Sequence, residues 1–253
     1  MKALLKYEFR KTWFAKLIFL GITAVAEIAF LIGIALGPAH ETGERLVTIG
    51  ALVLFMVAMF GVFIIGVQSV LTLHRDMNTK QGYMLYMTPR TSYQILGAKT
   101  LENGLSILLS GAFFFLLGFL DITLLFSRFG TLQQLWDFFQ DMLHAINKEI
   151  TLNTQTILCL TVSFLASWLA TVSMAYLADI LSSALLNGKR FNGIITFLIF
   201  ILLSVLLGWL QDVLQPARVA IDAGLLIRGG VSLVFSVLLY CASAWIMDRY
   251  LSV

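Results

Sequence analysis

The stretch LVTIGALVLFMVAMFGVFIIGVQSVLTL, residues 46–73, contains 28 residues and no charged side chain. A helix needs about 20 mainly apolar residues to cross a membrane, because each residue adds about 1.5 Å to a path of about 30 Å. Residues 46–73 are therefore long enough to cross a bilayer as one helix. Similar runs recur along the chain, so this type of stretch decides the fold class.

Six segments of the 253-residue chain meet this criterion, at about 17–36, 46–73, 93–120, 152–178, 191–210 and 227–247. Their lengths and glycines favour helices over barrel strands, whose alternating pattern is absent. We therefore expect an all-α membrane protein with six transmembrane helices, in which residues 1–253 form a single transmembrane domain.

The composition excludes several classes of protein. Hydrophobic residues make up 59% of the chain and charged residues only 12%, whereas soluble domains carry about 25% charged residues. A water-soluble fold would lack the polar side chains to cover its surface. The net charge of +3 is too small to indicate a nucleic-acid partner, and neither the three histidines nor the two cysteines have the spacing of a metal site.

The basic residues indicate the orientation. Twelve of the seventeen lie on one side of the predicted membrane: five before residue 17, four within 75–99, two within 187–190, and Arg249. Lysine and arginine accumulate on the cytoplasmic side. We expect both termini to be cytoplasmic, and the 76–99 connection to face the cytoplasm too.

Two amphipathic segments flank the predicted spans. Residues 1–16 place aromatic and aliphatic side chains near one helical face and basic ones elsewhere, which favours an interfacial helix on membrane lipid over a charged start of the first span. Residues 131–150 have apolar positions at helical spacing. They predict a helix on the outer leaflet or on the spans, with a partner or substrate surface as the alternative.

The sequence lacks the motifs of an enzyme or of an independent motor. There is no G-x-x-x-x-G-K-[ST] phosphate loop, no H-E-x-x-H and no G-x-S-x-G. An ion-coupled carrier would also place several ionisable groups in the membrane, and the predicted spans contain only Glu27 near their middle. We expect no catalytic site and no bound cofactor on this chain.

Glu27 has two interpretations. A charged acid at mid-membrane is unfavourable by roughly 2.5–3.5 kcal/mol, so this residue is protonated, paired or exposed to a wet cavity. It either contacts substrate or protons in a translocation pathway, or forms a helix–helix hydrogen bond as a neutral acid. The residues alone do not separate the two.

The connection DMNTKQGYMLYMTPRTSYQILGAK, residues 76–99, is chemically the most varied segment. Pro89 disfavours helix at Thr88, so we expect a short helix that ends there and a new helix that starts at Thr91 or Ser92. Aromatic residues with a basic rim are typical of protein interfaces. Anchoring in lipid headgroups is the alternative.

This connection resembles that of the membrane subunits of ABC-2 type transporters. The resemblance covers the order of elements over the whole chain and, locally, Asp76, Gly82, the string YMTPRT at 86–91 and the string ILGAK at 95–99. It implies a bacterial multi-pass permease of the cytoplasmic (inner) membrane, which pairs with a second permease subunit of the same or a related chain.

The resemblance also implies a cytosolic ABC ATPase partner, which holds the ATP and Mg²⁺. The 76–99 connection would be the coupling helix that contacts this ATPase, through Asp76, Lys80, Gly82, Tyr83, Leu85, Tyr86, Thr88, Pro89 and Arg90. Asp179, Ser182 and Ser183 would form a secondary contact, with an ordinary helix hairpin as the alternative. Glu27, Ser163, Ser167 and Thr171 are candidates for a translocation pathway.

We therefore expect the permease subunit of an ATP-driven exporter of a hydrophobic or amphipathic substrate, such as a peptide antibiotic, a drug or a lipid. This function rests on analogy with the family. A regulatory or assembly subunit without transport of its own is the main alternative, and a stand-alone ion-coupled carrier is a more distant one.

Overall fold

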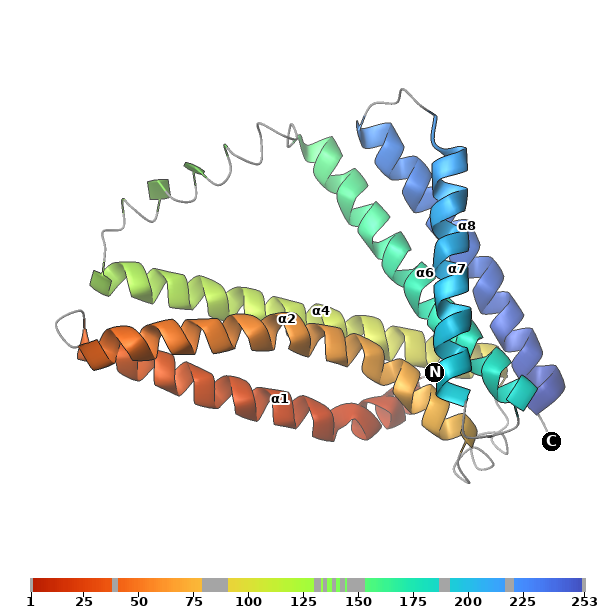
Figure 1. The fold of residues 1–253 in the computed structure, drawn as a ribbon, viewed down its shortest axis with the longest axis horizontal. Coiled ribbons are helices and arrows are strands. Elements are labelled where there is room, and N and C mark those ends of the chain that lie inside the picture. Colours follow the sequence, from red (N-terminus) through yellow and green to blue (C-terminus); the bar gives the residue numbers. More distant parts are fainter. Residues whose placement is uncertain are drawn as a thin grey trace. The chain divides into compact units, whose positions relative to one another are not determined.

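The computed structural model describes residues 2–37, 41–78, 91–129, 153–186, 192–216 and 221–251, and six single positions between 133 and 144. Its elements are α1 (Lys2–Leu36), α2 (Glu41–Asn78), α4 (Ser92–Phe129), α6 (Thr154–Leu186), α7 (Asn192–Leu214), α8 (Ile221–Ile246) and a π-helical turn, η1 (Met247–Leu251) (Figure 1). Within these residues, six helices are long and apolar enough to cross a membrane. The predicted all-α, multi-pass membrane class is confirmed at this level.

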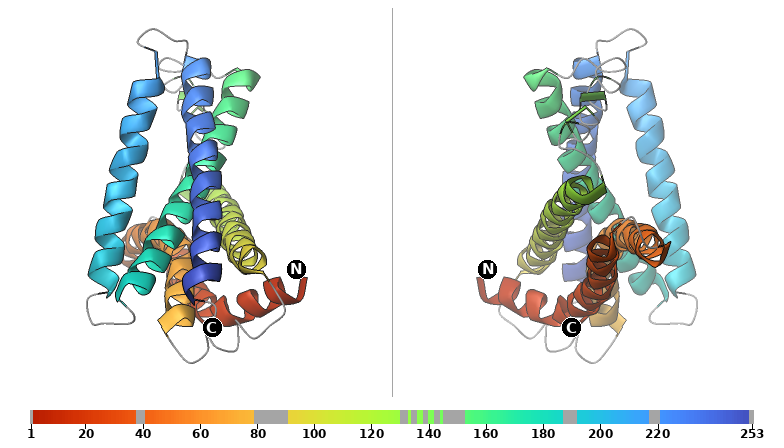
Figure 2. Two further views of the ribbon diagram at one scale, coloured as in Figure 1. Left: turned by 90° about the vertical axis from the view of Figure 1, so that its right-hand side faces the viewer. Right: turned by 90° about the vertical axis from the view of Figure 1, so that its left-hand side faces the viewer.

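The six predicted spans correspond to the six helices in order, and every helix extends beyond its predicted span at one or both ends. The largest difference at an N-terminal end is in α1, where the expected interfacial segment 1–16 and the first span form one continuous helix. No glycine or proline occurs before Gly21, so nothing in the sequence interrupts this helix. Its first turns run at an angle to the remainder (Figure 2), and Trp13 and Phe14 are exposed.

Local sequence features start and stop two of the helices. Gly37 ends α1 with a φ of 73°, a left-handed conformation that glycine adopts without strain. Within the 76–99 connection, α4 begins at Ser92. The preceding residue, Thr91, accepts a hydrogen bond from the Gln94 backbone N at its Oγ1, at 3.4 Å. The predicted restart at Thr91 or Ser92 is confirmed.

The described chain divides into two compact units. Among the described residues, those within 2–68 and 101–144 belong to the N-terminal unit, and those within 69–100 and 153–251 belong to the C-terminal unit. Helices α2 and α4 contribute to both, because each unit boundary falls inside them. The single transmembrane domain predicted for residues 1–253 stays a prediction.

In the N-terminal unit, α1, α2 and α4 run side by side (Figure 1). Their apolar core contains Ala26, Phe30 and Ile34 of α1 and Leu54 of α2. The two helices approach closely at Gly50, where an added Cβ would lie 2.9 Å from the backbone of Phe30. Small residues permit this close packing in membrane helices, where lipid competes with side chains for apolar contact.

In the C-terminal unit, α6, α7 and α8 pack together (Figures 1 and 2). One core cluster joins all three helices through Met174, Leu207 and Phe235, among others. A second cluster packs Tyr176 and Ile180 of α6 against Leu73 at the end of α2 and Leu96 at the start of α4. The two helix ends that flank the 76–99 connection are thus part of this unit's core.

Large apolar side chains cover much of the remaining surface. In α4 and in α7, only 6% of the residues in the most apolar 18-residue stretch are buried inside the protein. Phe115 and Leu202 are among the exposed side chains, at 74% and 67%. Apolar surface of this extent fits a lipid environment and not water.

Candidate functional site

The predicted coupling segment is only partly described. Residues 79–90 lie outside the described residues, and with them Lys80, Gly82, Tyr83, Leu85, Tyr86, Thr88, Pro89 and Arg90. Their predicted contact with an ATPase stays a prediction. The structure describes the helix ends on both sides of this segment, and these ends carry an unusual set of buried polar contacts.

The centre of this set is an ion pair between the two flanks. Lys99 Nζ of α4 donates to Asp76 Oδ2 of α2 at 2.8 Å, and the two side chains are only 1% and 4% exposed. A buried ion pair is strongly destabilised when one partner is removed, because the other charge is left without compensation. The pair therefore fixes the end of α2 to the start of α4. Asp76, predicted to contact the ATPase, directs its carboxylate into the protein.

Two further contacts attach α2 to α6. His74 Nδ1 lies 2.5 Å from Asp179 Oδ1, and the Ser69 hydroxyl lies 3.0 Å from the hydroxyl of Tyr176. Ser69 and Asp76 are seven positions apart, so they lie two helical turns apart on a shared face. This face of α2 is held by polar bonds above and below the apolar contact of Leu73.

The start of α4 is also attached to the C-terminal helix. The Ser92 hydroxyl donates to Asp248 of η1, and the Tyr240 hydroxyl of α8 donates to the backbone O of Tyr93 at 2.6 Å. We call the contacts of Asp76–Lys99, His74–Asp179, Ser69–Tyr176, Ser92–Asp248 and Tyr240–Tyr93 the flank clamp. It joins α2, α4, α6 and the α8–η1 segment within the C-terminal unit.

The second predicted ATPase contact is buried as well. Asp179, Ser182 and Ser183 are between 0% and 6% exposed. Ser182 Oγ donates to the backbone O of Asn192 at 2.8 Å, and Asn192 Nδ2 donates to Ser183 Oγ at 3.2 Å. These bonds join the end of α6 to the start of α7. Such contacts are expected in an ordinary helix hairpin, and the predicted secondary contact with an ATPase stays a prediction.

The N-terminal unit contains its own compensated acid. Glu102 Oε1 accepts hydrogen bonds from Lys16 Nζ at 2.6 Å, Thr12 Oγ1 at 2.8 Å and Ser106 Oγ at 2.9 Å. The side chain of Glu102 is 4% exposed. Sequence reasoning placed these residues on one side of the membrane but did not pair them, because their contact depends on how α1 and α4 are rotated.

Glu27 lies in the same unit, but its neighbour is an acid and not a base. Its side chain lies close to that of Asp121 of α4, which is only 9% exposed. Among the described residues, the buried Glu27 Oε2 has no hydrogen-bond partner. In the described part of the chain, no basic group forms an ion pair with either acid. Two neighbouring carboxylates repel each other, so this acid pair favours the binding of a proton or a cation.

The sequence predicted only Glu27 near the middle of the spans, and the structure adds Asp121, which lies inside α4. The third span was predicted to end at residue 120, just before this charge, but α4 continues to Phe129. The signal was present in the apolar residues ITLLF at 122–126, which extend the helical run beyond the acid.

The other predicted pathway residues lie on α6 in the C-terminal unit. Ser163 is buried against α8, where the Cβ position of Gly229 would lie 3.1 Å from its Cα. Ser167 and Thr171 are exposed, and Thr171 Oγ1 donates to the backbone O of Ser167 at 2.9 Å. Their role in a pathway stays a prediction.

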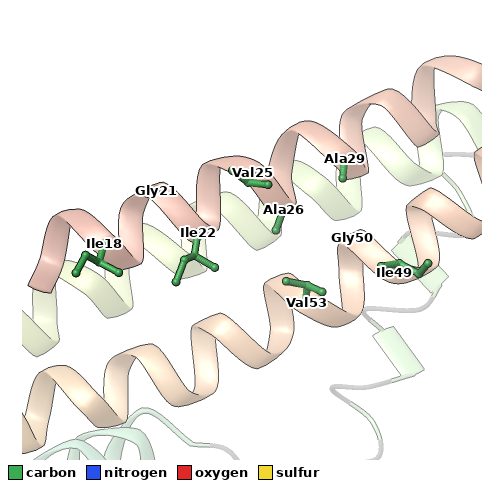
Figure 3. Close-up of a pocket in the computed structure, with 9 residues that line it drawn as sticks. All are labelled: Ile18, Gly21, Ile22, Val25, Ala26, Ala29, Ile49, Gly50 and Val53. Atoms are coloured by element: carbon green, nitrogen blue, oxygen red, sulfur yellow. The ribbon is translucent and has the colours of Figure 1, made fainter.

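Two grooves occur in the N-terminal unit. The apolar groove, of about 640 Å³, lies between α1 and α2 and is lined by Ile18, Gly21, Ile22, Val25, Ala26, Ala29, Ile49, Gly50 and Val53 (Figure 3). The acid groove, of about 550 Å³, lies between α2 and α4, with Phe30 of α1 contributing. Asp121 lines the acid groove, and the apolar groove has no ionisable lining residue.

Comparison with known proteins found no matching family model, no matching curated protein and no matching solved structure. The resemblance to ABC-2 permeases rests on the sequence stretches quoted above. The functions that it implies are taken up as a proposal.

Proposed function

We propose that this chain is the membrane-spanning permease subunit of an ATP-driven exporter. A separate cytosolic ATPase would bind the 76–99 connection and supply the energy, with ATP and Mg²⁺ on the partner chain. The cargo would be a hydrophobic or amphipathic molecule. The resemblance of residues 76–99 to the coupling segment of ABC-2 permeases points to this reading, and the flank clamp is the observation that carries it.

The flank clamp supports the proposal on mechanical grounds. The segment that would receive the ATPase begins and ends at helices joined by a buried ion pair. Hydrogen bonds continue from these helices to α6 and η1. A displacement of residues 79–90 would therefore move several membrane helices of this unit together, because packed elements transmit motion as rigid bodies.

The proposed setting follows from the basic residues. Their excess at the N-terminus and at 75–99 supports a cytoplasmic location for both termini and the connection. The bacterial setting is what the resemblance to ABC-2 permeases implies. The first turns of α1, with exposed Trp13 and Phe14, would lie on the inner leaflet of the cytoplasmic membrane. A second permease subunit, identical or related, would complete the transporter.

The first test is co-purification from the native membrane. We expect tagged wild-type protein in mild detergent to retain a protein that contains a phosphate-binding loop and hydrolyses ATP. Tyr86→Ala and Leu85→Ala should lose this ATPase, because they remove apolar contact area from the proposed coupling helix. Tyr7→Ala and Leu185→Ala are matched controls, since both side chains are exposed outside residues 79–90.

The outcomes separate the candidate functions. Wild-type retention of the ATPase in both connection variants would overturn the coupling assignment. A retained ATPase without ATP-dependent transport in liposomes would favour the regulatory or assembly subunit. Transport by the chain alone, without nucleotide, would favour the ion-coupled carrier.

A further inference from the structure

We infer that the acid groove binds a lipophilic organic cation, whose charged centre lies at the Glu27–Asp121 pair and whose apolar body fills the space between α2 and α4. The inference names the chemical class of the cargo, and in that respect it rests on the proposed function. Binding itself is a property of this chain and is tested without an ATPase.

The size and lining of the groove fit a small organic molecule. Its volume of about 550 Å³ lies inside the range of roughly 300–1,000 Å³ that is typical of ligand sites. Eleven of its thirteen lining residues have apolar side chains or, in one case, no side chain; the other two are Thr48 and Asp121. A ligand would therefore present a mainly apolar surface and one polar centre.

The charge of the groove selects a cation. Among the described residues that line it, Asp121 is the one ionisable side chain. The neighbouring acid, Glu27, makes the electrostatic potential at this position more favourable for a cation. Elsewhere in this unit Glu102 is compensated by Lys16, but the described chain provides no such partner for the Glu27–Asp121 pair. A buried acid that lacks a base within the protein favours a ligand that brings one.

The chemistry of the walls favours an organic cation over a metal ion. Hard metal ions need six or more oxygen ligands in a polar shell, and within the described residues no group of three or more acidic, histidine or cysteine side chains could hold one. Phe30, Phe55 and Phe114 line the groove instead. Aromatic rings attract organic cations through their faces and pack against apolar groups.

The position of the site gives the ligand a route through the bilayer. Asp121 precedes the end of α4 at Phe129 by eight residues and Glu27 precedes the end of α1 at Leu36 by nine, so each lies about 12–14 Å along the helix from that end. Phe55 at the rim is 69% exposed on an apolar surface. A lipophilic cation concentrated in the membrane can enter from the side.

The test measures binding of radiolabelled tetraphenylphosphonium to the purified chain in lipid nanodiscs, without ATP and without a partner. We expect saturable binding that neutral triphenylphosphine oxide displaces weakly. Glu27→Gln combined with Asp121→Asn should weaken binding at least tenfold. Ala58→Phe, which fills the acid groove and keeps both acids, should weaken it by a similar factor.

Two controls make the result specific. Ala29→Phe fills the apolar groove, and Glu44→Gln removes an exposed acid of α2; both should bind within twofold of wild type. Helix content and thermal unfolding in the same nanodiscs establish that the variants fold. Equal binding by the double variant, or equal competition by the neutral probe, would overturn the inference. Either outcome leaves the ATPase test unaffected, so the two proposals fail separately.

Discussion

Two buried acidic sites connect α1 with α4 in the N-terminal unit, and they differ in how their charge is compensated. Glu102 is surrounded by Lys16, Thr12 and Ser106, which all donate to the same carboxylate oxygen. Among the described residues, the charged neighbour of Glu27 is another acid, Asp121. A compensated charge stabilises helix packing, whereas an uncompensated one lowers stability unless a ligand or proton supplies what is missing. We take the first type as structural and the second as a binding site.

The flank clamp extends this comparison to the C-terminal unit. Asp76 and Lys99 neutralise each other's charge, and both side chains are almost completely buried. By the same criterion, the clamp is structural. Its residues hold the helices beside the predicted coupling segment. Asp76 and Asp179, which the resemblance assigned to ATPase contacts, direct their carboxylates into this clamp.

The largest effect is expected for Lys99→Met, which leaves the Asp76 carboxylate buried without a counter-charge. The free energy of unfolding should fall by about 3–5 kcal/mol, measured by denaturant titration of the purified protein in micelles. Asp76→Leu combined with Lys99→Met should recover most of this loss. Arg45→Met, which breaks the exposed pair with Glu41, is the matched control and should change little. A single Lys99 variant as stable as this control would contradict the clamp.

A smaller effect is expected for Glu102→Ala. Three donors lose their acceptor, but Lys16 is 21% exposed and can reach solvent, so the loss should be about 1–3 kcal/mol. The same titration measures it, with Glu44→Ala as the exposed control. If Glu102→Ala and Glu44→Ala unfold at the same denaturant concentration, the site is not structural.

Tyr240→Phe should be weaker still. It removes one hydrogen bond to the backbone of Tyr93 and keeps the ring, for an expected loss of about 0.5–1.5 kcal/mol. Tyr7→Phe, at an exposed position of α1, provides the reference. If Tyr240→Phe and Tyr7→Phe have the same free energy of unfolding, the Tyr240–Tyr93 hydrogen bond does not stabilise the flank clamp.

The smallest change in stability is expected for Glu27→Gln combined with Asp121→Asn. Neutral amides can bond to each other without excess charge, so the free energy of unfolding should stay the same or rise slightly. The comparison with Glu102→Ala is the informative quantity, because the two acidic sites should respond with opposite signs. A loss of more than about 1 kcal/mol in the double variant would show that the pair holds the helices together.

The order and type of the helices could be predicted from the sequence because long apolar runs are a strong signal. The start of α4 could also be predicted, because Pro89 and Thr91 act locally on the backbone. The end of α4 was placed too early, at a charge that the helix tolerates. Helix ends depend on the surroundings of the residue, and here another acid shares the site.

The pairing of side chains could not be predicted from these patterns. Lys99 and Asp76 are 23 positions apart, and Lys16 and Glu102 are 86 apart. Their contacts depend on the rotation and depth of whole helices, which apolar periodicity leaves open when a helix is apolar on all sides. For the same reason the sequence did not indicate that Asp179, Ser182 and Ser183, the expected secondary contact with the ATPase, are buried.

The most direct test of the account is transport in proteoliposomes that contain the chain and its co-purified ATPase, with the membrane potential collapsed by valinomycin and equal potassium concentrations. We predict that tetraphenylphosphonium accumulates against its concentration gradient only when ATP is hydrolysed. Tyr86→Ala should abolish this accumulation through loss of the ATPase, and the Glu27→Gln, Asp121→Asn double variant should abolish it with the ATPase still bound. Accumulation of the cation at the wild-type rate in vesicles without nucleotide would contradict the central claim that an external motor drives this chain.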